Sequence, residues 1–159
     1  MTLSIPQLRG NFDGGGRRFA IVASSYNQSV VAKLLDGAVE CLTAHGVAAA
    51  DVQVVRVPGA WEIPQALEEI AARGTADALI AIGAVIRGDT PHFDYICSEC
   101  SGGAGRVAAK YRIPVTFGVL TCENPQQAEE RAGGKAGNKG AEAALAALEM
   151  ASLLQKLRA

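Results

Sequence analysis

The stretch ALIAIGAVIRGDTPH (78–92) decides the fold, because an apolar run over 78–85 passes directly into a polar, glycine-containing loop. A continuous apolar run of this length, without alternation, is typical of a strand buried on both faces of a parallel sheet. Apolar residues recur at helical spacing over 63–73, before the run, and over 95–111, after the loop. The stretch therefore predicts one strand of a parallel sheet with a helix on either side of it in the chain.

The same alternation of strand and helix extends over the rest of the chain. Pro64 is compatible with the first turn of the 63–73 helix, and Gly74 lies just beyond its end. The other predicted strands are 19–24, 52–57 and 114–120, and the other predicted helices are 30–42, 126–131 and 139–157. Because crossovers between parallel strands are right-handed, this order predicts an α/β fold, a flavodoxin-like three-layer α/β/α sandwich with a four-stranded parallel sheet.

Residues 18–159 are expected to form a single domain, since 159 residues with 49% apolar content suffice for one core. Residues 1–17 precede the first strand and are expected to form an N-terminal arm. Pro6 disfavours helix there, and Gly14–Gly16 are expected to act as a flexible hinge.

The bulk composition excludes several classes of function. The formal net charge is −1, so the chain has no general attraction for nucleic acid or for an acidic membrane. No apolar run is long enough to cross a bilayer and the first residues lack a hydrophobic signal segment, so we expect a cytoplasmic protein. The four cysteines (Cys41, Cys97, Cys100 and Cys122) are too few for a disulfide scaffold. Cys97 and Cys100 have CxxC spacing without further zinc ligands, which favours a packing role.

Ligands of open α/β sheets bind beyond the carboxyl ends of the strands, where this chain concentrates its unusual residues. In GDTPH (88–92), backbone N–H groups ahead of a predicted helix could hold a phosphate, and His92 suits proton transfer at neutral pH. The alternative is an ordinary strand-to-helix turn capped by Asp89 or Thr90, with an exposed histidine.

Two other strand ends carry aromatic residues. In PGAWEIP (58–64), Trp61 could wall a pocket and Glu62 could accept hydrogen bonds from a ligand. The alternative is a core tryptophan beside a first-turn glutamate that favours the helix dipole. Tyr26 follows the first strand and could stack on a flat heterocycle, or could be a half-exposed packing residue.

The segment RAGGKAGNKG (131–140) places Arg131, Lys135 and Lys139 among glycines. It lacks the GxxxxGK[ST] pattern of a P-loop. Two interpretations stay open, a flexible, solvated connection between helices and an anion clamp.

Five segments, taken in chain order, resemble the lumazine synthase family. They are FAIVASSYN, VPGAWEIP, GAVIRGDTPHFDY, IPVTFGVLT and QQAEERAGGKAGNKG, and the resemblance covers roughly residues 18–157. It implies a condensation of 5-amino-6-(D-ribitylamino)uracil with 3,4-dihydroxy-2-butanone 4-phosphate. The products are 6,7-dimethyl-8-ribityllumazine, phosphate and water, in the penultimate step of riboflavin biosynthesis, and the family needs no metal or organic cofactor.

The resemblance also implies roles for individual residues. His92 matches the proton donor and acceptor, and Tyr26 stands where family members often carry Phe or Trp. Many members have Phe in place of Trp61. Asp89, Thr90 and Arg131 match the phosphate contacts. The pyrimidine and ribityl contacts match Tyr26, Ala60, Trp61, Glu62, Ala84, Val85, Ile86, Phe117 and Lys139, of which Phe117 belongs to the adjacent subunit.

Finally, the resemblance implies a homo-oligomer whose sites lie between neighbouring subunits of a pentamer. The short GGKAGNKG turn is similar to that of members whose pentamers close into a 60-subunit icosahedral shell, and riboflavin synthase is an expected further partner. Two alternatives stay open. An archaeal-type riboflavin synthase would not need Arg131 or the GDT loop, and a non-catalytic flavin-binding shell protein would not need His92.

Overall fold

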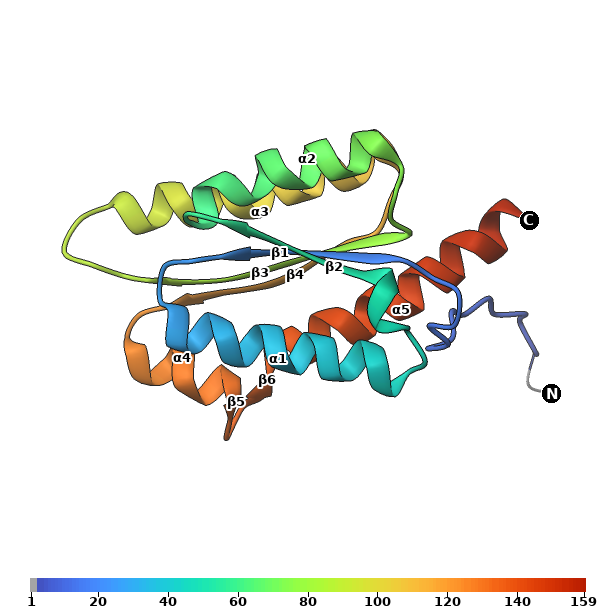
Figure 1. Cartoon of the computed structure of the whole chain (residues 1–159), viewed down its shortest axis with the longest axis horizontal. Coiled ribbons are helices and arrows are strands. Elements are labelled where there is room, and N and C mark those ends of the chain that lie inside the picture. The colour runs from blue at the N-terminus through green and yellow to red at the C-terminus, as the bar shows by residue number, and fades with distance from the viewer. Residues whose placement is uncertain (1–2) are drawn as a thin grey trace.

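Four parallel strands form the central layer of the computed structural model, which describes residues 3–159 (Figure 1). They are β1 (Phe19–Ser24), β2 (Val52–Val57), β3 (Ala78–Ile86) and β4 (Val115–Cys122). The strand order is β2-β1-β3-β4, so the chain leaves β1 toward one edge and then returns to its other side. The boundary between β1 and β3 is therefore the topological switch point, where open α/β sheets bind their ligands.

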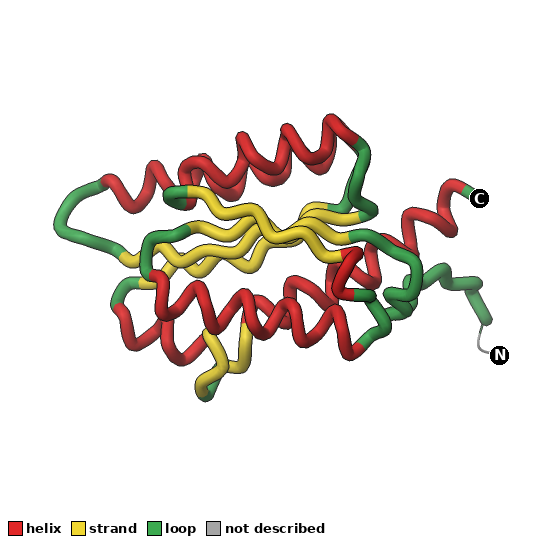
Figure 2. Tube along the Cα trace, viewed as in Figure 1, coloured by secondary structure: helices red, strands yellow, loops and turns green. Residues whose placement is uncertain are grey.

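Helices cover both faces of this sheet, which confirms the predicted flavodoxin-like three-layer sandwich (Figure 2). On one face lie α2 (Ile63–Arg73) and α3 (His92–Tyr111). The other face carries α1 (Gln28–Ala44), the short α4 (Pro125–Arg131) and α5 (Lys139–Arg158). The 3-10 turns η1 (Ala49–Asp51) and η2 (Ala60–Glu62) flank β2, and a small hairpin of β5 (Ala132–Gly134) and β6 (Gly137–Asn138) joins α4 to α5.

The apolar runs of the sequence become strands that contribute to two cores at once. All six residues of β1 are buried, with Ile21 packed in the core under α1 and α5 and Val22 in the core under α2 and α3. By contrast, β2 lies at the sheet edge and is partly exposed, and Val54 has 41% of its surface accessible. Burial of β1 and β3 on both faces is what fixes the sheet order and hence the position of the switch point.

The largest difference at a predicted helix start is in α3, which begins at His92 and not at Tyr95. Pro91 has a φ of −63°, which suits a residue at a helix start, and the Asp94 amide donates to the Pro91 carbonyl at 3.0 Å. Phe93 is almost fully buried and anchors this extra turn. His92 is therefore the first residue of a helix and not part of the preceding loop.

Residues 131–140, for which a solvated connection and an anion clamp both stayed open, contain a small hairpin. Ala132 pairs with Asn138, and Gly134 pairs with Gly137, in an antiparallel hairpin. Gly137 has a φ of +78°, a conformation that favours glycine. The Asn138 side chain accepts from the Ala141 amide and donates to the Lys33 carbonyl, so it caps α5 and ties the hairpin to α1.

The N-terminal segment has no helix or strand over residues 3–17, and its second half is bound to the body of the molecule. The Asn11 amide donates to Ser152 Oγ at 2.6 Å, and the Gly14 amide donates to the His45 carbonyl at 2.8 Å. Within the glycine triplet, Gly14 is buried against the body, whereas Gly15 and Gly16 are exposed in a turn. Met1 and Thr2, the start of the predicted arm, lie outside the described residues.

Candidate active site

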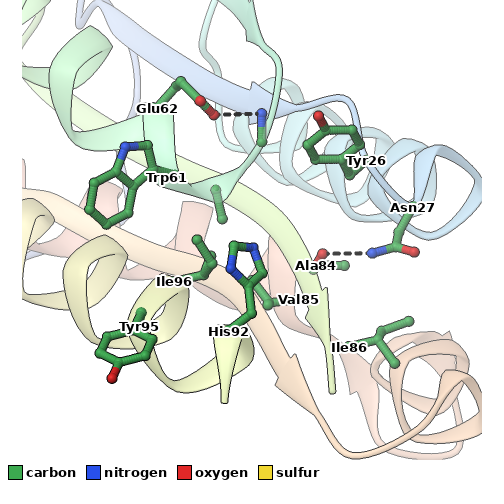
Figure 3. A pocket seen from close by; sticks show the side chains of 12 residues that line it. Tyr26, Asn27, Trp61, Glu62, Ala84, Val85, Ile86, His92, Tyr95 and Ile96 are labelled. Atoms are coloured by element: carbon green, nitrogen blue, oxygen red, sulfur yellow. Dashed lines mark hydrogen bonds between the residues drawn. The ribbon is translucent and has the colours of Figure 1, made fainter. Parts of the chain in front are cut away.

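A cleft of about 640 Å³ lies at the carboxyl ends of β1, β2 and β3, at the switch point of the sheet (Figure 3). This size is typical of small-molecule sites. It is lined by Tyr26, Asn27, Gly59, Ala60, Trp61, Glu62, Ala84, Val85, Ile86, His92, Tyr95 and Ile96. Eight of the predicted site residues therefore meet at one place, because the parallel strands deliver their loops to the same edge.

Tyr26 is held in the cleft by the loop that follows β2. The Pro58 carbonyl accepts hydrogen bonds from the amides of Ser25 and Tyr26, at 3.0 and 3.2 Å. Gly59 leaves space for the tyrosine ring, since a Cβ atom built there would lie 2.8 Å from two ring carbons. Tyr26 as a whole is 68% exposed, so its ring is accessible for stacking on a flat ligand.

Glu62 and Trp61 line the cleft from the turn η2, just after Gly59 (Figure 3). Glu62 Oε2 accepts from the Gly59 amide at 3.0 Å, which fixes the carboxylate at the mouth of the turn. A carboxylate has further acceptor capacity, so Glu62 can still bind ligand N–H or O–H groups. Trp61 is 53% exposed, and it is therefore a pocket wall and not the core tryptophan of the alternative interpretation.

Asn27 is a pocket residue that sequence reasoning missed. Its φ of 56° and ψ of 47° place it in the left-handed region, at the start of α1, and its Nδ2 donates to the Ala84 carbonyl at 2.9 Å. Asparagine is one of the few residues that tolerate this conformation, which is the signal that the sequence offered. The bond joins the end of β3 to the start of α1 across the floor of the cleft.

His92 lines the cleft from the first turn of α3 (Figure 3). Tyr95 and Ile96, three and four residues later, share its helix face and line the cleft as well. They were missed because the helix was expected to start at Tyr95. Asp89 and Thr90 are exposed in the loop just before His92 but are not among the lining residues.

Three further predicted site residues, Phe117, Arg131 and Lys139, do not line the cleft of the same chain either. Phe117 pairs in register with Ala81, and Ala84 pairs with Leu120, so Phe117 lies three residues before the level of the cleft. At the usual rise of a strand this is about 10 Å. Arg131 ends α4 and Lys139 begins α5, both on the sheet face that carries α1 (Figure 1).

The cations of the hairpin region are held by local partners. Arg131 donates to the Gln127 carbonyl at 3.0 Å, and Lys139 pairs with Glu142 at 2.8 Å. The hydrogen bond from Lys135 lowers the pKa of Glu130. Exposed pairs of this kind contribute little free energy, so a ligand phosphate could compete for these cations.

Burial raises the pKa of both thiols of the CxxC pair. Cys100 is fully buried in α3, and burial raises the pKa of its thiol to about 12, which disfavours the nucleophilic thiolate. Among residues 3–159, no group of three or more His, Cys, Asp or Glu side chains is placed to hold a metal ion. Within the same range, every helix is too short or too polar to span a membrane.

The topology and the cleft define the class, a flavodoxin-like α/β protein with a small-molecule site at its switch point. Residues 16–155 match the family model described as 6,7-dimethyl-8-ribityllumazine synthase. A protein of that name from Aquifex aeolicus (strain VF5) is 52% identical over 149 residues, which cover 94% of this chain and 97% of the relative. The chain therefore belongs to the 6,7-dimethyl-8-ribityllumazine synthase family, and with it to the transferases of riboflavin biosynthesis.

Proposed function

We propose that the chain condenses 5-amino-6-(D-ribitylamino)uracil with 3,4-dihydroxy-2-butanone 4-phosphate to give 6,7-dimethyl-8-ribityllumazine, phosphate and two molecules of water. The observation that carries the proposal is the cleft, in which an exposed aromatic ring, a fixed carboxylate and a histidine meet in a chain that belongs to this family. No chemistry beyond binding, positioning and proton transfer is required of these residues.

The pyrimidine is proposed to stack on Tyr26, whose free face is directed into the cleft. Glu62 and the backbone groups of Ala60–Glu62 and Ala84–Ile86 supply hydrogen-bond partners for the ring and the ribityl chain. This arrangement suits a planar, polar ligand, because apolar contact comes from the walls while a few polar groups at the edge define its orientation.

His92 is proposed to move protons as the reaction proceeds. The amine attacks the ketone and water leaves to form an imine, after which phosphate departs and ring closure releases water. Each step needs a proton delivered or removed, which an imidazole can do near neutral pH. Holding the two substrates together supplies much of the remaining acceleration.

A second copy of the chain is proposed to complete the site. Phe117, Arg131 and Lys139 lie away from the cleft of their own chain, so they are free to serve the cleft of a neighbour. The neighbour's Arg131, with the backbone of Asp89 and Thr90, would bind the phosphate, since its planar fork suits bidentate anion binding. Phe117 would close the aromatic wall and Lys139 would approach the ribityl chain. The proposed assembly is a pentamer, with pentamers closing into a 60-subunit icosahedral shell in the cytoplasm.

The direct test is to mix both substrates with the purified protein and to follow lumazine absorbance together with released phosphate. The proposal expects the two signals to rise in parallel. Riboflavin formed from lumazine alone would indicate a riboflavin synthase, and tight flavin binding without turnover would indicate a non-catalytic shell protein. Sedimentation and electron microscopy would test the assembly, and a lone pentamer at every pH would contradict the shell.

A further inference from the structure

Arg87 lies directly after β3 and contacts three parts of the carboxyl edge of the sheet. Its Nε donates to Glu123 Oε2 at 2.8 Å, just beyond β4, and its terminal nitrogen pairs with Asp94 Oδ1 at 3.3 Å, in the first turn of α3. The guanidinium carbon lies 4.3 Å from the centre of the Phe93 ring. The Arg87 amide also donates to the Cys122 carbonyl at 2.9 Å. One residue thus joins β3, β4 and α3.

These contacts bracket the loop 88–91, because Arg87 stands immediately before it and Phe93 and Asp94 stand just after it. The loop is bound to α3 by a backbone bond from the Asp94 amide to the Pro91 carbonyl at 3.0 Å and has little other support. Its residues are exposed, and the His92 amide approaches Thr90 Oγ1 only at 3.4 Å, near the limit for a hydrogen bond. The geometry of the loop therefore depends on how firmly its two ends are held.

We propose that Arg87 is a positioning residue, which holds the loop 88–91 and His92 in the geometry that the reaction requires. This inference rests on the proposed function. Arg87 does not line the cleft, so it acts through the residues that it holds. Its planar fork contacts two carboxylates while its face lies on an aromatic ring, a combination that a lysine ammonium cannot reproduce. Displacing the loop by an ångström would misplace both the phosphate contacts and the histidine.

The experiment compares Arg87→Met with Arg106→Met, a matched control on α3 that removes an exposed pair with Glu99. For Arg87→Met we expect faster hydrogen–deuterium exchange over residues 88–94. We also expect the KM for the phosphate substrate to rise about tenfold, because the charge-assisted bonds that hold the loop are lost. The KM for the pyrimidine should change less than about twofold, because the Tyr26 wall is not tethered by Arg87. Arg87→Lys should recover only part of the difference, and Arg106→Met should behave as the unmodified protein in both measurements.

Unchanged exchange and unchanged kinetics in Arg87→Met would overturn the inference. An equal rise in both KM values with exchange faster throughout the chain would also overturn it, since it would show general support of the fold. If Arg87→Met does not fold, Glu123→Gln gives the same comparison, because it weakens the bond that Arg87 Nε donates to Glu123. Exchange needs no turnover, so it decides whether Arg87 orders the loop even if the unmodified protein makes no lumazine and the proposed function fails.

Discussion

His92 places an imidazole in the cleft at the start of α3, facing the wall that carries Trp61 and Glu62 (Figure 3). In the proposed reaction it speeds proton transfer but forms no covalent bond. We therefore expect His92→Ala to lower kcat by about ten- to a hundredfold and to leave measurable turnover, because proximity still acts and water can carry protons. Steady-state kinetics with both substrates would measure this. His45→Ala is the control, since His45 lies at the end of α1 and donates to the Cys41 carbonyl, and its kcat should not change.

Gly59 determines where the Tyr26 ring lies in the cleft. Because glycine has no side chain, the loop after β2 can pack closely against this ring. In Gly59→Ala the new methyl group would overlap the ring and turn it out of the cleft. We expect the KM for the pyrimidine to rise about tenfold, the value of one lost stacking contact. Substrate titration would test this against Tyr26→Phe, which keeps the ring and should bind nearly normally. Equal affinity in both variants would show that Tyr26 does not stack on the substrate.

At the scale of elements, apolar periodicity predicted the sheet and its helices well because burial dominates those positions. The helix over Ile63–Arg73 has the predicted bounds, and the buried β1 matches its apolar run. The start of α3 was missed because it depends on tertiary contacts, Phe93 beneath Arg87, that no local pattern displays. The β5–β6 hairpin was missed for a related reason. Its glycines are compatible with many conformations, and the bonds of Asn138 to neighbouring elements select one.

The same limit applies to the site. Residues at strand ends could be placed together from sequence, since parallel strands share an edge, and Tyr26, Glu62 and His92 do line one cleft. Asn27 was not found, because its contribution is a long-range bond to the Ala84 carbonyl. Residues that position other side chains are therefore harder to predict from a sequence than residues that would contact a ligand.

The contact between α1 and α5 depends on Gly140. A Cβ atom built at this buried residue would lie 1.9 Å from the Leu34 carbonyl oxygen, which is backbone and cannot swing away. Gly140→Ala should therefore force the two helices apart and cost about 3 kcal/mol of stability, at the upper end of ordinary overpacking. Thermal unfolding at one fixed protein concentration would measure the loss. The exposed Ala146 of the same helix offers a control, because Ala146→Gly should cost only the helix propensity difference of about 1 kcal/mol.

At the scale of the whole molecule, the two halves of the proposed site lie on different sides of one chain. The cleft is open at the switch point, whereas Arg131 ends α4 on the sheet face that carries α1 and α5 (Figure 1). Phe117 is 41% exposed on the edge strand β4, so its ring is accessible to a neighbouring chain. An arrangement in which each chain completes its neighbour's cleft accounts for both observations.

This arrangement makes a prediction about mixed assemblies. His92→Ala should lower kcat, and Arg131→Ala should mainly weaken use of the phosphate substrate, so each variant alone should turn over slowly when that substrate is scarce. If a site takes His92 from one chain and Arg131 from the next, co-assembled variants contain some sites with both residues intact. In a ring assembled at random from equal amounts of the two variants, each interface joins two chains in a fixed order. About a quarter of the interfaces then combine an intact His92 with an intact Arg131, because each chain is the required variant about half of the time. Activity should therefore recover to about that fraction of the unmodified protein, as measured after co-expression at limiting phosphate substrate. Activity equal to the mean of the two variants would place both residues in the same chain's site, because no mixture could then restore an intact one.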